Sequence, residues 1–133
     1  MAGYWLEWSA KRLPETLKNF KLLDNTRVII IGKKSIEMTR DDFKKYIRLS
    51  REERIVLKTR LTTDSIEINS ILRNNLLGIK NVEFIDLAAL ISGNAPDSCP
   101  VFTPEGQLIY YDGSHLTQAG AAYMGSFLRD LLP

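Results

Sequence analysis

The stretch "RVIIIG", residues 27 to 32, decides the fold of this chain of 133 residues. Four consecutive β-branched residues, Val28 to Ile31, are closed by Gly32. Such an unbroken run is typical of a strand buried on both faces, as in a parallel sheet, because a half-exposed strand would alternate apolar and polar residues. A second run, "VEFIDL" from Val82 to Leu87, predicts another strand.

Helical patterns lie on both sides of the first strand. Apolar residues recur at helical spacing between Glu7 and Leu23, and Pro14 predicts that the regular helix starts late. Thr39 predicts the start of a short helix. Ser50, with Glu53 three residues later, has the pattern of a capping box and predicts a further helix.

The helix that starts at Ser50 is expected to run to Leu77, with a break near residues 62–64. A short helical turn follows the second strand, and a loop rich in Gly, Asn, Pro and Ser spans residues 92–100. Two short extended pieces then surround a Pro-Glu-Gly turn, and a last helix starts at Thr117. Helices that alternate with buried strands indicate an α/β fold with a parallel sheet.

We expect a single domain over residues 1–133, because no linker divides the chain. Two central strands are few for a doubly wound sheet. Tyr4, Trp5 and Trp8 stand near the first residue, where they would be costly to leave in water. Both observations indicate that N-terminal strands of the sheet are missing from this chain. A homodimer or a partner that covers the aromatic residues is the alternative.

Composition and charge narrow the classes of protein. Apolar residues make up 44% and charged residues 26%, which suits a folded domain, and a net charge of +2 does not suggest a nucleic-acid binder. The apolar runs are too short to cross a bilayer, and no secretory signal opens the chain.

The charges are unevenly distributed along the chain. Between Lys33 and Arg60, Lys and Arg outnumber Asp and Glu by ten to five. We interpret this basic segment as a solvated helix face, and the alternative is a surface that binds phosphate or anionic lipid. Cys99 is the only cysteine, so no disulfide forms within the chain, and we interpret it as a buried residue rather than a nucleophile.

Asp112 and His115 form the candidate site. The only histidine stands three residues after this aspartate, in "YYDGSHLTQAG", residues 110 to 120. A general base for acyl transfer needs one ring nitrogen that faces a nucleophile, while a carboxylate accepts a hydrogen bond from the other nitrogen. Gly113 and Ser114 suit the tight turn that would bring the two side chains together. Spacing alone leaves a plain polar loop histidine as the alternative, and a metal site is disfavoured because the chain has no second histidine.

The block "YYDGSHLTQAGAAYMG" resembles the last block of the SGNH (GDSL-like) hydrolase superfamily. It is most similar to the version fused to integral-membrane acyltransferases that O-acetylate surface polysaccharides. That block reads roughly Tyr-x-Asp-x-x-His-Leu-Ser/Thr-x-x-Gly-Ala, and the matching residues here are Tyr110 or Tyr111, Asp112, His115, Leu116, Thr117, Gly120 and Ala121. Further stretches resemble the family in the same order along the chain, namely "YWLEWS", "RVIIIGKKSIE", "VEFIDLAALI", "SCPVF" and "GQLIYYD".

The chain also departs from the family in three places. The family's nucleophile is a serine in a Gly-Asp-Ser motif near the N-terminus of the domain, and no Gly-Asp-Ser occurs here. Only Cys99 stands where the family often has two cysteines, and Ser35 or a neighbour takes the place of the family's proline. The chain is therefore similar to the C-terminal two-thirds of an SGNH domain, whose serine and oxyanion-hole donors would lie outside it.

The resemblance implies a three-layer, SGNH/flavodoxin-like α/β fold and a parent enzyme that transfers or removes an acyl group on a carbohydrate hydroxyl. His115 would act as the base and Asp112 would orient it, without metal or organic cofactor. The resemblance also implies a membrane-embedded acyltransferase domain upstream, with this domain periplasmic or extracellular. The isolated chain would be inactive. The alternative is a non-catalytic module, derived from an SGNH domain, that binds glycan or protein.

Overall fold

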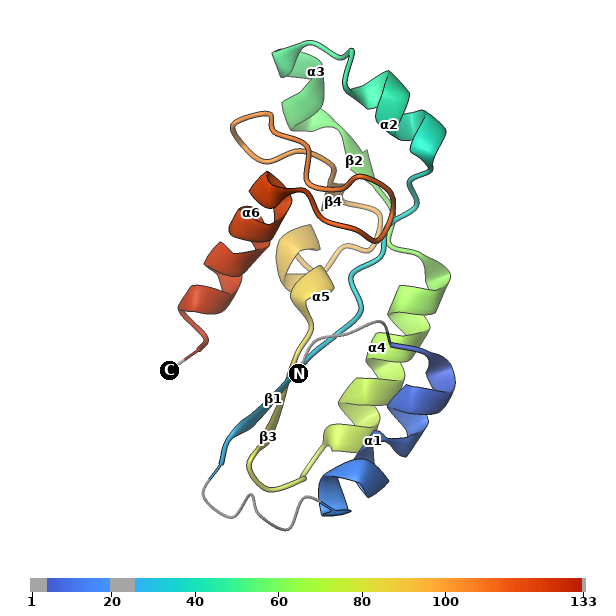
Figure 1. The fold of residues 1–133 in the computed structure, drawn as a ribbon, viewed down its shortest axis with the longest axis vertical. Helices are drawn as coiled ribbons and strands as arrows, with labels where there is room; N and C mark the ends of the chain where they lie inside the picture. The colour runs from blue at the N-terminus through green and yellow to red at the C-terminus, as the bar shows by residue number, and fades with distance from the viewer. Residues whose placement is uncertain (1–4, 20–25, 133) are drawn as a thin grey trace. The chain divides into compact units, whose positions relative to one another are not determined.

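The computed structural model describes residues 5–19 and 26–132, so Tyr4 and the end of the first predicted helix lie outside the described residues. The helices and strands are α1 (Glu7–Asn19), β1 (Val28–Ile31), α2 (Arg40–Tyr46), α3 (Arg51–Val56), β2 (Lys58–Thr59), α4 (Thr63–Leu76), β3 (Val82–Ile85), α5 (Leu87–Ser92), β4 (Cys99–Pro100) and α6 (Gln118–Arg129) (Figure 1). They form two compact units, residues 1–33 with 63–86 and residues 34–62 with 87–133. The expectation of a single domain stays a prediction.

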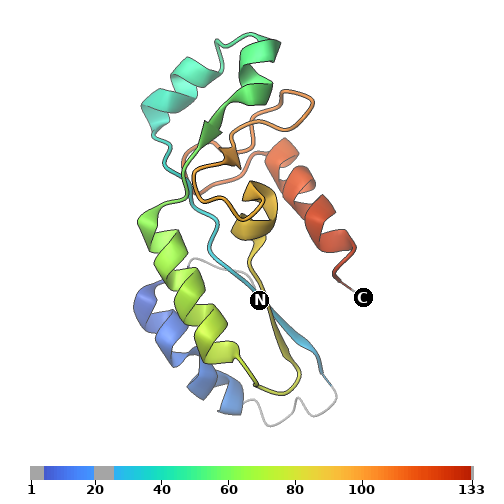
Figure 2. The same cartoon turned by 180° about the vertical axis from the view of Figure 1, so that it is seen from behind.

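The first unit contains the parallel pair of strands that the sequence predicts. β1 and β3 run parallel, with Val28 opposite Val82 and Ile31 opposite Ile85. Helices α1 and α4 lie side by side, as both Figure 1 and Figure 2 show. A parallel pair joined by a helical crossover confirms the α/β fold class.

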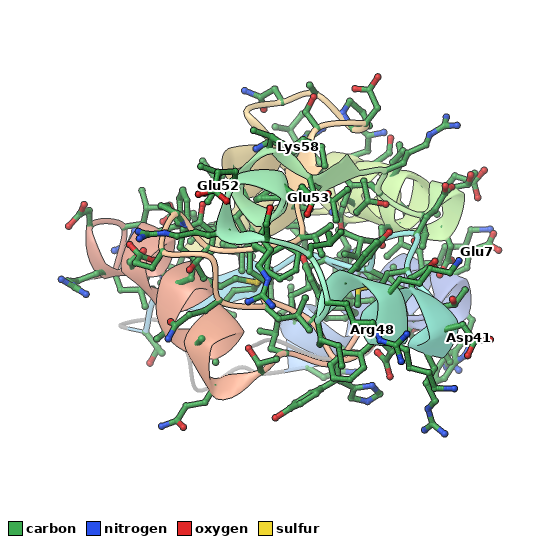
Figure 3. The ribbon with its side chains drawn as sticks, turned by 90° about the horizontal axis from the view of Figure 1, so that it is seen from above. Glu7, Asp41, Arg48, Glu52, Glu53 and Lys58 are labelled. Atoms are coloured by element: carbon green, nitrogen blue, oxygen red, sulfur yellow. The ribbon has the colours of Figure 1, made fainter. Side chains whose placement is uncertain are left out.

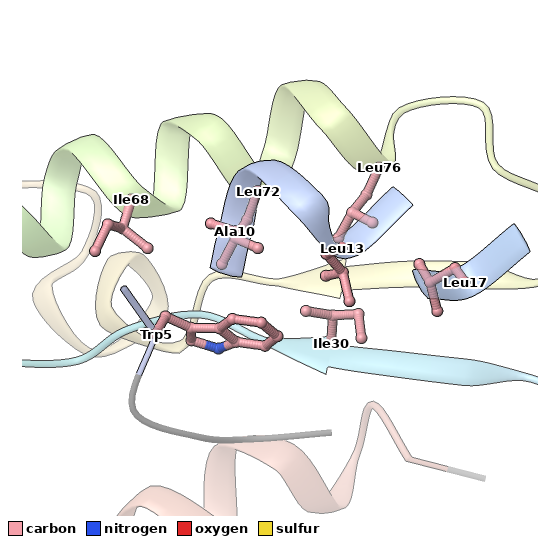
Figure 4. Packing of buried hydrophobic residues seen from close by; sticks show 8 residues of the cluster. All are labelled: Trp5, Ala10, Leu13, Leu17, Ile30, Ile68, Leu72 and Leu76. Atoms are coloured by element: carbon pink, nitrogen blue, oxygen red, sulfur yellow. The ribbon is translucent and has the colours of Figure 1, made fainter. Parts of the chain in front are cut away.

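An apolar core joins the two helices to β1. Ile30 and Leu72 are completely buried, and Figure 4 shows their side chains among those of α1 and α4. Trp5 is also buried, and its indole Nε1 donates a hydrogen bond of 2.7 Å to the carbonyl oxygen of Ile31. Trp8 is 63% exposed. The chain therefore covers Trp5 by itself, and of the aromatic residues in the described part that motivated a dimer, only Trp8 faces solvent.

The prediction that Pro14 delays the first helix is wrong. Helix α1 begins at Glu7 and contains Pro14 in its interior. Proline removes one backbone hydrogen bond from a helix, a cost that packing can outweigh. Here Ala10, Leu13 and Leu17 lie on one helical face and are all buried in the core, which favours the continuous helix.

A buried amide fixes the end of β1 in the first unit. The Asn69 side chain accepts a hydrogen bond from the Lys33 backbone nitrogen at 2.6 Å and donates to the Lys33 carbonyl oxygen at 2.8 Å. It also donates to the Asp86 carboxylate at 3.0 Å, which pairs with Arg73 at 2.7 Å. One side chain of α4 therefore satisfies the backbone where β1 ends and holds the residue that follows β3.

The second unit begins with two short capped helices. Thr39 and Ser50 are the N-caps of α2 and α3, and both helices carry complete capping boxes, the second with Glu53 as predicted. Figure 3 labels charged side chains of this region, among them Arg48 in the turn after α2 and Glu52 in α3, and both residues are exposed. This exposure agrees with the interpretation of the basic segment as a solvated face from residue 40 onward, whereas Lys33 is buried and Lys34 is half-buried. No helix of the described residues is long and apolar enough to cross a bilayer.

The prediction of a helix from Ser50 to Leu77 is wrong in the middle of that range. Helix α3 ends at Val56, and the chain then runs extended as β2, antiparallel to β4. Leu61 forms a further antiparallel bridge with Ile36 and is buried. Pairing with chain segments distant in sequence overrides the local helical pattern here, and the short strand β4 inside the predicted loop was missed for the same reason.

Helix α6 packs closely on the chain before it. Thr117 is its N-cap and accepts a hydrogen bond from the Gly120 nitrogen at 2.9 Å. A Cβ atom added to Gly120 would lie 2.0 Å from the carbonyl oxygen of Ile109. Only glycine permits this approach, which fixes the start of α6 against the segment that leads into the candidate site.

Two glycines of α6 should respond to alanine with opposite signs. Gly120→Ala forces an overlap with Ile109 and should destabilise the chain by about 1–3 kcal/mol. Gly125 has open space around its Cβ position, so Gly125→Ala should stabilise the chain by about 0.5–1 kcal/mol through helix propensity. Urea unfolding followed by circular dichroism measures both, and equal effects would contradict the close packing.

Candidate active site

Asp112 organises the turn that carries the only histidine. Its Oδ1 atom accepts hydrogen bonds from the backbone nitrogens of Ser114 and His115 at 2.8 and 2.9 Å. The base of the turn is closed by an antiparallel bridge between Tyr110 and Leu116. The Tyr111 nitrogen also donates to the His115 carbonyl oxygen at 2.8 Å. The local sequence thus folds into a closed loop of residues 111–115 that carries both the aspartate and the histidine.

The two predicted site residues are in contact. Nδ1 of His115 lies 2.9 Å from Oδ2 and 3.1 Å from Oδ1 of Asp112. The hydrogen bonds from the His115 and Ser114 backbone nitrogens lower the pKa of Asp112 to about 2, so the carboxylate is ionised at neutral pH and only accepts hydrogen bonds. Nδ1 must therefore be the donor, which leaves Nε2 of a neutral ring as a proton acceptor.

The His115 ring stands out from the surface. Its side chain is 81% exposed and that of Asp112 is 45% exposed. A ring in this position is open to a nucleophile or a substrate that approaches from solvent. The arrangement has the parts that acid–base chemistry requires, namely an ionised carboxylate, an oriented ring and a free nitrogen. The catalytic role of Asp112 and His115 stays a prediction.

The segment of residues 36–38 holds the turn from one side. The Ile36 nitrogen donates to the Gly113 carbonyl oxygen at 2.8 Å, and the Gly113 nitrogen donates to the Met38 carbonyl oxygen at 3.0 Å. A Cβ atom on Gly113 would lie only 2.3 Å from the Ile36 carbonyl oxygen. Gly113, predicted as a turn residue, is thus required because the turn packs directly on another backbone.

Lys34 also contacts the turn, and the sequence reasoning missed it. Its Nζ atom donates to the Ser114 carbonyl oxygen at 2.9 Å. The neighbouring Ser35 hydroxyl lies 3.3 Å from the Ser114 hydroxyl, and the Tyr110 hydroxyl donates to the Lys34 carbonyl oxygen at 3.3 Å. The signal available in the sequence was position, because Lys34 follows shortly after a buried strand, where α/β folds place functional residues.

Other candidate groups fit structural roles. Cys99 is buried, and burial raises the pKa of its thiol to about 11, so it stays protonated and unreactive at neutral pH, as predicted. Burial also raises the pKa of Tyr110. No group of three or more potential metal ligands occurs among residues 5–19 and 26–132.

Comparison with known proteins identifies one family. The model of the family described as "SGNH domain (fused to AT3 domains)" matches residues 5–130. This match spans both compact units and includes Asp112 and His115. No curated protein and no solved structure matches the chain.

The low pKa of Asp112 makes its contribution to stability depend on pH. A carboxyl group whose pKa is lowered on folding stabilises the native state above its unfolded pKa of about 3.9, and this contribution is lost as the pH falls toward the folded value. We expect Asp112→Asn to lower the free energy of unfolding at pH 7, and the difference from wild type to shrink as the pH falls from about 4 to about 2.

Urea unfolding at a series of pH values tests this expectation. Asp97→Asn is the matched control, because Asp97 is an exposed aspartate of the same unit. A difference between wild type and Asp112→Asn that stays constant from pH 7 to pH 2 would contradict the hydrogen-bonded carboxylate.

Proposed function

The chain belongs to the family of SGNH domains fused to AT3 (acyltransferase) domains, and from this membership we propose that its parent protein transfers or removes an acetyl or related acyl group on hydroxyls of cell-surface polysaccharide. Membership of this family establishes that the chain is an SGNH-type module related to hydrolases and acetyltransferases. The observation that carries the proposal further is the contact of 2.9 Å between Nδ1 of His115 and the carboxylate of Asp112.

In the proposed reaction, Nε2 of His115 takes the proton of a serine hydroxyl as the serine oxygen attacks the carbonyl carbon of an acyl ester. The imidazolium then returns this proton to the departing alcohol oxygen, which leaves an acyl-serine. Water or a sugar hydroxyl attacks the acyl-serine with the same assistance and regenerates the serine. Asp112 keeps the ring in the tautomer that accepts at Nε2 and stabilises the imidazolium.

We place the serine nucleophile outside these 133 residues. The support is that the sequence contains no Gly-Asp-Ser, the motif in which the family carries its serine. A carbohydrate or acyl-ester substrate would then bind where the supplied serine meets the exposed His115 ring.

We further propose the partner and the location of the domain. The family description, with its fusion to AT3 domains, supports an acyltransferase domain in the same parent protein. If that acyltransferase domain is embedded in a membrane, this module would act on the periplasmic or extracellular side of the membrane, where surface polysaccharide is available. A nucleic-acid partner is not proposed, since the net charge is only +2.

Replacement of the base should abolish turnover by the parent protein. We expect His115→Ala to lower kcat for acyl transfer by about 10³-fold or more, because removal of a triad member leaves only the residual contribution of binding and the oxyanion hole. Asp112→Asn should lower kcat as well, since an amide does not fix the tautomer in the same way. Release or incorporation of labelled acetyl groups measures both variants, with Asp97→Asn as the control. Activity retained in His115→Ala would refute the assignment.

The 133 residues alone should hydrolyse esters little or not at all. They supply a base and its orienting carboxylate, whereas a nucleophile and oxyanion-hole donors account for most of the rate in this chemistry. Hydrolysis of a chromogenic acetyl ester by the purified chain measures this. Robust turnover that disappears in His115→Ala would show that the nucleophile lies within the chain.

A binding module without catalysis is the second candidate function. The specific observation in its favour is a surface groove of about 440 Å³ on α1, lined by Trp8, Arg12 and Thr16 among others. An exposed tryptophan beside polar groups is suited to stack on a sugar ring. Glycan binding by the chain that survives replacement of both Asp112 and His115, and is lost in Trp8→Ala, would favour this function over catalysis.

A further inference from the structure

We propose that Lys34 is a positioning residue for His115. Its ammonium group and the Asp112 carboxylate hold one peptide group, the one that joins Ser114 to His115, from opposite ends. This inference deepens the proposed function and rests on it. It concerns a residue outside the Asp-x-x-His block and on a different segment of the chain.

The geometry of this peptide group is the first support. Its carbonyl oxygen, that of Ser114, accepts from Nζ of Lys34 at 2.9 Å. Its nitrogen, that of His115, donates to Oδ1 of Asp112 at 2.9 Å. A cation at the oxygen and an anion at the N–H group both match the peptide dipole, and hydrogen bonds to charged groups are stronger than those between neutral groups.

The peptide group sets the direction of the ring. Rotation of the plane between Ser114 and His115 would swing the bond from Cα to Cβ of His115 and move Nδ1 away from Asp112. Without Lys34, the N–H end of the plane would be held by Asp112 and the His115 carbonyl group by the Tyr111 nitrogen, but the Ser114 carbonyl end would have no charged partner. The bond from Lys34 restrains this end, and we therefore expect the 2.9 Å contact between Nδ1 and Oδ2 to depend on Lys34 as well as on the aspartate.

Lys34 is itself held in place. The Tyr110 hydroxyl, on a buried side chain, donates to the Lys34 carbonyl oxygen at 3.3 Å. Two positions along, the Ile36 nitrogen donates to the Gly113 carbonyl oxygen at 2.8 Å. The backbone at Lys34 and at Ile36 is thus bonded to the loop that the Lys34 side chain holds, which restrains the position of the ammonium group.

The partial burial of Lys34 separates this role from that of an ordinary surface lysine. Burial lowers the pKa of Lys34, and the negative charge of Asp112 acts in the opposite direction. A lysine without a role would extend its ammonium group into the solvent, since its side chain is long enough to reach it. Here the ammonium stays half-buried against a carbonyl oxygen of the candidate site.

The test uses the fact that His115 is the only histidine, so its ring signals in nuclear magnetic resonance spectra need no assignment. Long-range ¹H–¹⁵N spectra of the 133-residue chain at about pH 8, where an ordinary imidazole is neutral, report which nitrogen carries the proton. In wild type we expect the Nδ1–H tautomer to dominate. In Lys34→Met we expect its population to fall to about half or less, and in Lys34→Arg we expect recovery, because the guanidinium keeps the charge and the donors.

Lys58→Met is the matched control, because it removes an exposed lysine charge from the same unit and should leave the tautomer unchanged. An unchanged tautomer in Lys34→Met would overturn the proposal. If that variant does not fold, the proposal is tested by the exchange rate of the lysine ammonium protons with water in the wild type. We expect this rate to be about tenfold lower for Lys34 than for Lys58, because the Lys34 ammonium donates a hydrogen bond. Equal exchange rates would overturn the proposal as well.

These measurements need no turnover, so the two proposals fail separately. A parent enzyme that stays active without His115 would refute the proposed function and leave the tautomer result standing. An unchanged tautomer would refute the role of Lys34 and leave the base assignment intact. In an active parent, Lys34→Met should lower kcat by roughly 10- to 100-fold with little change in KM, the loss expected when a reacting group is misplaced.

Discussion

The carboxylate of Asp112 accepts hydrogen bonds from three nitrogens, and the geometry of the candidate site depends on this one group. Two of the nitrogens are backbone amides of the following turn, and the third is the ring Nδ1 of His115. The backbone donors fold the turn and keep the carboxylate ionised, and the ionised carboxylate then fixes the ring. The same carboxylate therefore stabilises the turn and orients the His115 ring. A change in the conformation of the turn must also change the orientation of the ring.

The turn would still be mobile if it stood alone in solvent. It packs instead on the backbone of residues 36–38, an approach that Gly113 permits because a side chain there would overlap a carbonyl oxygen. Lys34 adds a charged contact from the same segment. Residues 34–38 lie more than seventy positions before the turn in the sequence. They supply both the backbone on which the turn packs and the positive charge of Lys34 beside Asp112. This is a common way to hold a reactive side chain, since the supporting groups matter as much as the reacting ones.

The first compact unit serves a different physical purpose. Ile30 of β1 is buried among side chains of α1 and α4, Val82 and Phe84 of β3 are partly buried against the same core, and Asn69 satisfies the backbone polar groups where β1 ends. Of the four residues of β1 only Ile30 is fully buried, and the Glu83 side chain of β3 is 42% exposed, so the pair is not buried on both faces as the β-branched run had predicted. The match of one SGNH family model across both units is consistent with one part that gives the sheet its core and another that carries the candidate site.

The sequence by itself determined the elements whose signals are local. The β-branched run from Val28 to Ile31 predicted β1, the capping residues Thr39 and Ser50 predicted two helices, and the block around His115 predicted the contact with Asp112 and the family. Each of these depends on residues within a few positions of one another. Only the tertiary structure decided that α1 runs through Pro14, that the chain after Val56 is extended, and that Lys34 contacts the turn. The physical reason is common to all three, because burial and pairing with distant segments outweigh local preferences of about 1–3 kcal/mol, and no window of sequence contains those partners.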